Sequence, residues 1–142
     1  MIESGAIALH LVEKYGGKDH PLLGKPETRG KLLQWLFYGP ATFYPRITPP
    51  YADESFKKDE AKMKALRESF EQTSYPLLNA ALENSEYLLG NEFTLADIMM
   101  GYYVDSLRFL GWLDEKNHPK LAAYMARLDS RRSFKLAYTP PQ

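Results

Sequence analysis

The chain has 142 residues, of which 44% are hydrophobic and 25% charged, a composition typical of a soluble globular domain with a sizeable core. Its 18 basic and 18 acidic residues balance, so charge gives no reason to expect a nucleic-acid or anionic-membrane partner. The lack of cysteine excludes disulfides, thiolate metal sites and a cysteine nucleophile within this sequence. Without a membrane-length apolar run or a secretion-signal pattern, the default expectation is a cytoplasmic protein.

The first predicted element is an amphipathic helix over residues 3–15. Apolar residues recur on one helical face at every fourth position: Ile7, Leu11 and Tyr15. The pair Gly16-Gly17 ends this helix, and residues 17–26 form a linker by composition, with turn formers around a short apolar anchor.

A second helix is predicted over residues 27–38, with Gly39-Pro40 kinking it and Pro49-Pro50 breaking the chain firmly. A long helix then runs from about Glu54 to about Asn84. Its first half is dominated by charge and is predicted to face solvent. Pro76 predicts a kink in its second half.

A helix-start motif precedes residues 94–110. Thr94 is the predicted N-cap, its hydroxyl accepting from the Asp97 N–H, while the Asp97 carboxylate reaches back to the Thr94 N–H. The residues that follow are apolar nearly all round, so this helix is predicted to be buried. Further helices begin at Pro119 and near Ser133. The sequence therefore predicts an all-α bundle of about five to six helices, with no strand.

Several ordered motifs together resemble the C-terminal helical domain of cytosolic glutathione transferases. They are Tyr87-Leu88-Leu89-Gly90, the Thr94–Asp97 capping box, Gly111-Trp112-Leu113 and His118-Pro119-Lys120-Leu121. Ile2-Glu3-Ser4-Gly5-Ala6-Ile7 looks like the segment that starts the last helix of the family's thioredoxin-like domain. The resemblance implies that residues 1–16 are that last helix, 17–26 the interdomain linker and 27–142 the helical domain. The rest of the thioredoxin-like domain is expected to be missing.

Glu3-Ser4 is the pair with the clearest chemistry. An acid and a hydroxyl beside the unpaired N–H groups of a helix start can hold an ammonium and a carboxylate together. From spacing alone, a simple helix cap is the favoured interpretation of this pair. The resemblance favours binding of the γ-glutamyl group of glutathione, with Glu3 on its amino group and Ser4 on its carboxylate.

The resemblance also places the electrophile pocket along the second helix, which makes Tyr38, Thr42, Phe43 and Arg46 the candidate pocket residues. Aromatic residues at helical spacing are more often core or dimer surface, so that interpretation stays open for each of them. Two interpretations of Arg46 stay open: it orients an anionic substrate, or it is simply a solvent-exposed cation. Thr94 and Asp97 are assigned a structural role only.

The predicted function is that of the electrophile-pocket domain of a glutathione transferase, with glutathione as co-substrate and a hydrophobic electrophile as its partner. The thiolate-activating residue is expected on the missing domain, so no catalytic residue is assigned and the chain alone is expected to be inactive. The three histidines are widely spaced, and no metal is expected. A homodimer or swapped assembly is expected to cover the apolar face of the first helix. The alternative is a non-catalytic interaction module of the same fold.

Overall fold

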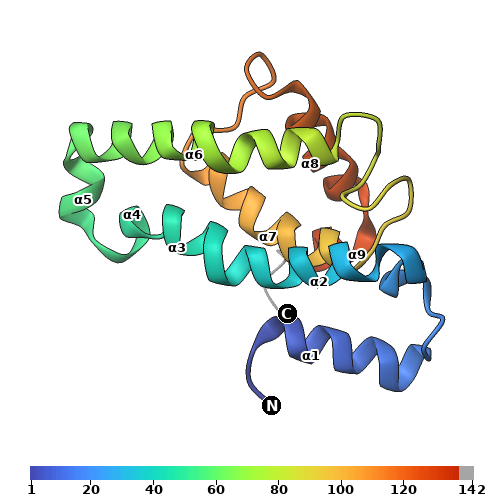
Figure 1. The fold of residues 1–142 in the computed structure, drawn as a ribbon. Helices are drawn as coiled ribbons and strands as arrows, with labels where there is room; N and C mark the ends of the chain where they lie inside the picture. The colour runs from blue at the N-terminus through green and yellow to red at the C-terminus, as the bar shows by residue number, and fades with distance from the viewer. Residues whose placement is uncertain (138–142) are drawn as a thin grey trace.

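The computed structural model describes residues 1–137, except for the side chain of Tyr51, and confirms the all-α class. Within residues 1–137 every regular element is helical, apart from an isolated bridge between Tyr87 and Gly90 (Figure 1). The end of the chain, residues 138–142, lies outside the described residues.

Helix α1 (Ser4–Leu11) continues into the π-helical segment η1 (Val12–Gly16). Gly17 follows with a φ of 84°, a left-handed conformation that favours glycine and that turns the chain away from the helix. The predicted linker holds the short 3₁₀ turn η2 (Pro21–Leu23), and a second 3₁₀ turn, η3 (Pro26–Thr28), begins at its last residue.

Helix α2 (Arg29–Tyr38) leads without a break into the π-helical segment η4 (Gly39–Phe43) and then into α3 (Tyr44–Ile47). Helix α4 (Pro49–Ala52) follows after one residue, Thr48, which itself has right-handed helical angles. The break predicted at Pro49-Pro50 coincides with the boundary between α3 and α4. The two prolines occupy the first positions of a helix, where the missing N–H costs no intrahelical hydrogen bond.

The long helix predicted from Glu54 is divided into α5 (Glu54–Lys58) and α6 (Glu60–Ala81). Asp59 separates them, because its extended backbone ends α5 while its carboxylate accepts from the Lys62 N–H, 3.0 Å away, and begins α6. Helix α6 runs through Pro76.

Helix α7 (Leu95–Phe109) is the centre of the bundle and contacts α1, α2, η4 and α8 (Pro119–Ser130); the short α9 (Arg132–Ala137) follows α8 (Figure 1). Most of α7 is buried, as expected. One stripe is not, because Ile98, Tyr102 and Phe109 are 41%, 56% and 71% exposed. The sequence pattern, apolar nearly all round, gave no indication of this exposed stripe.

The start of α7 is organised around the Asp97 carboxylate, which is fully buried. It accepts from the Thr94 N–H at 2.8 Å and from the Thr94 hydroxyl at 3.1 Å, while the Asp97 N–H donates to the Thr94 carbonyl oxygen at 3.1 Å. It also accepts from the Leu88 N–H at 3.0 Å and from the Tyr124 hydroxyl at 3.2 Å. Asp97 thus joins the loop before α7 to α8 as well as starting the helix.

Candidate functional site

The pair Glu3-Ser4 lies where α1 begins, and both residues are exposed. Glu3 has a φ of 70°, in the left-handed region that a residue with a side chain rarely adopts. Its side chain makes no capping hydrogen bond to α1, so the carboxylate is available to another group. Backbone outliers of this kind cluster at binding sites.

Helix α1 contacts α7, and the Ser4 side chain lies close enough to Tyr103 of α7 to influence the pKa of its phenol. Tyr103 is only 6% exposed, and its ring centroid lies 5.3 Å from those of both Tyr44 and Tyr102. Burial raises the pKa of Tyr103 above its ordinary value, while the neighbouring Ser4 side chain acts in the opposite direction. An acid, a hydroxyl and three phenol rings therefore meet where α1, α3 and α7 converge.

The candidate pocket residues Tyr38, Phe43 and Arg46 face α6 instead of α1. The Tyr38 hydroxyl donates to the Ser74 Oγ at 3.0 Å, and the Arg46 guanidinium donates to the Thr73 Oγ1, also at 3.0 Å. Phe43 is fully buried, with its ring 6.2 Å from that of Phe70.

Thr42, the fourth candidate, is half-buried in η4. The structure therefore brings Tyr38, Phe43 and Arg46 together against α6 but does not bring them to Glu3-Ser4. Tyr44 and Tyr103 take that place. A π-helical turn holds more residues than an α-helical turn, so η4 changes which face the residues after it occupy.

Beside Glu3 lies a mostly apolar groove of about 280 Å³ between α1 and α2. Its walls are Gly5, Ala6 and Leu9 from α1 and Leu33, Leu36, Phe37 and Pro40 from the α2–η4 segment. Glu3 is the one charged residue among the described residues that line this groove.

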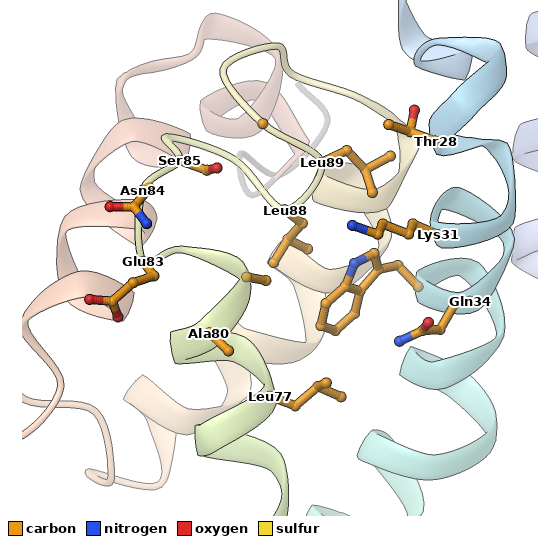
Figure 2. Close-up of a pocket in the computed structure, with 13 residues that line it drawn as sticks. Thr28, Lys31, Gln34, Leu77, Ala80, Glu83, Asn84, Ser85, Leu88 and Leu89 are labelled. Atoms are coloured by element: carbon orange, nitrogen blue, oxygen red, sulfur yellow. The ribbon is translucent and has the colours of Figure 1, made fainter.

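A second cavity of about 460 Å³ lies between α2, the end of α6 and the loop after it. Figure 2 shows Lys31 and Gln34 extending from α2 toward Leu77 and Leu88 on the other side. Glu3 and Ser4 are absent from its lining, so this cavity is separate from the tyrosine cluster. Its polar groups come from α2, the end of α6 and the loop after it.

Within residues 1–137, no three His, Asp or Glu side chains are grouped so as to hold a metal ion. None of the helices described in that range combines the length and the apolar character needed to cross a membrane.

Comparison with known proteins identifies the family to which this chain belongs. The family model described as "Glutathione S-transferase, C-terminal domain" matches residues 42–137, and the chain belongs to this family. The chain is similar to glutathione S-transferase D7 of Drosophila melanogaster, with 30% identity over 135 aligned positions that cover 84% of this chain and 57% of that protein. It thus spans less than two thirds of that relative.

Solved structures agree on the fold. An epsilon-class glutathione S-transferase from the housefly, Musca domestica, is 26% identical with a TM-score of 0.78, covering 96% of this chain and 63% of that one. A glutathione transferase of Bombyx mori is 26% identical with a TM-score of 0.73, covering 96% and 61%. A homolog from Drosophila mojavensis that holds bound glutathione is 23% identical with a TM-score of 0.77, covering 95% and 62%, and shows likeness of fold alone.

Proposed function

We propose that this chain is the helical, electrophile-binding part of a glutathione transferase. In the whole protein it would contribute to attack by the glutathione thiolate on hydrophobic electrophiles. The observation that carries the proposal is the position of Glu3-Ser4, which begins α1 directly beside the phenol cluster of Tyr44, Tyr102 and Tyr103.

The γ-glutamyl end of glutathione carries an ammonium and a carboxylate on one carbon, and the start of α1 offers a partner for each. The free Glu3 carboxylate suits the ammonium, while the Ser4 hydroxyl and the unpaired N–H groups of the first helical turn suit the carboxylate. The positive end of the helix dipole adds to the attraction for the carboxylate. Glutathione held in this way would extend along the tyrosine cluster, whose rings suit an apolar electrophile.

The thiolate-activating group is not assigned to any residue of this chain. In the proposed protein, residues 1–16 are the last helix of a thioredoxin-like domain, 17–26 the linker and 27–142 the helical domain. The proposed location is the cytoplasm, and the proposed assembly is a homodimer or a swapped assembly. The exposure of Ile7, Leu11 and Tyr15, which are 36%, 48% and 74% exposed, supports a covering partner for α1.

Calorimetric titration of glutathione into the chain tests the proposed binding, using wild type, Glu3→Ala and Glu13→Ala. Glu13 is the matched control because it is an exposed acid on the same helical segment that pairs with Arg29 at 2.8 Å. We expect binding that is lost in Glu3→Ala and kept in Glu13→Ala. An absence of binding heat for wild type would overturn glutathione binding by this chain and leave it as a scaffold and substrate-pocket part.

A further inference from the structure

The cavity of about 460 Å³ between α2 and the end of α6 carries a row of hydrogen-bond donors on its α2 wall. Lys31, Gln34 and Trp35 stand at positions i, i+3 and i+4 of that helix, so their side chains share one face. In Figure 2 the side chains of Lys31 and Gln34 extend from this face into the cavity. An ammonium, an amide and an indole N–H therefore line the same wall.

Trp35 supplies a buried donor that has no partner in the protein. The residue is 3% exposed, and within residues 1–137 no acceptor is hydrogen-bonded to its Nε1–H. The indole nitrogen is not sealed inside the core, because the fully buried side-chain atoms without a partner in that range are His118 Nδ1 and Arg131 Nε. Since Trp35 lines the cavity, its N–H is available to an acceptor that enters there.

The charge of the cavity favours an anion. Among the described residues that line it, Lys31 is the one base and Glu83 the one acid. Glu83 forms an ion pair with Lys120 of α8, which lies outside the lining. Within residues 1–137 no ion pair joins the Lys31 ammonium to a carboxylate. One positive charge on the α2 wall is therefore left without a partner.

The opposite wall is apolar and held in a fixed position. It includes Leu77 of α6 and Leu88 of the loop that follows α6. Two hydrogen bonds hold this loop, one from the Leu88 N–H to the Asp97 carboxylate and one from Arg127 Nε to the Glu86 carbonyl oxygen, each 3.0 Å long. The cavity is thus formed in advance, and a ligand need not order the loop in order to bind.

We propose that this cavity binds a small monocarboxylate with an apolar body. The carboxylate accepts from the Trp35 N–H and pairs with the Lys31 ammonium, and the apolar body lies against Leu77 and Leu88. A hydrocarbon would leave the Trp35 N–H unpaired, and a multiply charged anion would meet only one unpaired cation. The inference does not depend on glutathione binding, because Glu3 and Ser4 are absent from this lining.

The test titrates phenylbutyrate into the labelled chain and follows the tryptophan indole N–H signals by proton–nitrogen correlation NMR. The chain has two tryptophans, Trp35 and Trp112, and Trp112 does not line the cavity. We expect a saturable shift of the Trp35 signal with the Trp112 signal unchanged. Trp35→Phe assigns the two signals. A Trp35 signal that does not move, or equal movement of both signals, would overturn the proposal.

The role of charge is tested by comparing phenylbutyrate with its neutral amide, phenylbutyramide. We expect wild type to bind the carboxylate about three- to tenfold more tightly, as for a charged hydrogen bond to a lysine that is partly open to solvent. Lys31→Gln should abolish this preference. Lys58→Gln, which removes the same charge from an exposed lysine of α5, should keep it. Equal affinity of wild type for both compounds, or a preference that survives Lys31→Gln, would show that the cavity does not select a carboxylate.

Glu3→Ala separates this cavity from the start of α1. We expect the Trp35 signal to respond to phenylbutyrate equally in wild type and Glu3→Ala, and to respond in the presence of glutathione as well. Loss of the response in Glu3→Ala, or its suppression by glutathione, would mean that the probe binds beside Glu3-Ser4 and would contradict a separate carboxylate site.

Discussion

Replacement of Asp97 by alanine tests whether this carboxylate serves only as a helix cap. A lost cap costs about 1 kcal/mol. Asp97 also accepts from the Leu88 N–H and the Tyr124 hydroxyl, and each would be left buried without an acceptor at about 1–3 kcal/mol. Removing the carboxylate also removes the unfavourable free energy of burying it, and this offsets part of the predicted destabilisation. We therefore expect Asp97→Ala to lower the free energy of unfolding by about 3 kcal/mol.

Thermal unfolding followed by circular dichroism measures the effect. For a chain of this length, about 3 kcal/mol corresponds to a fall in Tm of roughly 10 °C. Asp105→Ala is the matched control on the same helix, because Asp105 pairs with Arg108 at the surface, where a pair contributes less than about 1 kcal/mol. If Asp97→Ala were no less stable than Asp105→Ala, the description of Asp97 as a four-donor junction would be wrong.

Three further predictions follow from burial and exposure. Burial raises the pKa of Asp97, so the ionised carboxylate is disfavoured in the folded state. The unfolding free energy of wild type, relative to that of Asp97→Asn, should therefore be largest below pH 3.8 and should fall as the pH rises through the folded-state pKa. Urea titrations at several pH values measure this difference. Phe43→Ala should cost about 3–5 kcal/mol in urea unfolding, because Phe43 is fully buried; a cost below about 1 kcal/mol would return it to the candidate pocket walls. Wild type should self-associate in light scattering and Leu11→Lys should do so less, whereas a wild-type monomer would contradict the predicted assembly.

Local signals in the sequence were sufficient for most of the helical architecture. The apolar spacing from Ile7 to Tyr15, ended by Gly16-Gly17, predicted the first helix, and η1 does end at Gly16. The predicted helix over 94–110 corresponds closely to α7, Leu95–Phe109. Both predictions rest on periodicity and on the chemistry of helix ends, which act within a few residues of the chain.

Other features depend on contacts between distant residues. His118 is fully buried with its Nε2 3.0 Å from a carboxylate oxygen of Glu71, a position that spacing along the chain did not indicate. The division at Asp59 was missed because the sequence on both sides of it favours helix. The helix start at Asp59 could have been recognised, because aspartate is a favoured N-cap residue whose carboxylate can accept from the backbone N–H three residues later, here that of Lys62.

The candidate site illustrates the same limit on what local signals reveal. Glu3-Ser4 was visible because an acid and a hydroxyl at a helix start form a local pattern, but the tyrosine beside Ser4 belongs to a helix near the other end of the chain. The substrate-facing side of the second helix was assigned to Tyr38 and Arg46, which bond to α6. The π-helical segment η4 lies between Tyr38 and Tyr44. Regular α-helical spacing therefore does not predict which residues after Tyr38 share a helix face with it. Tyr44 and Tyr103, and not Tyr38 and Arg46, are accordingly the residues that lie in the aromatic cluster beside the start of α1.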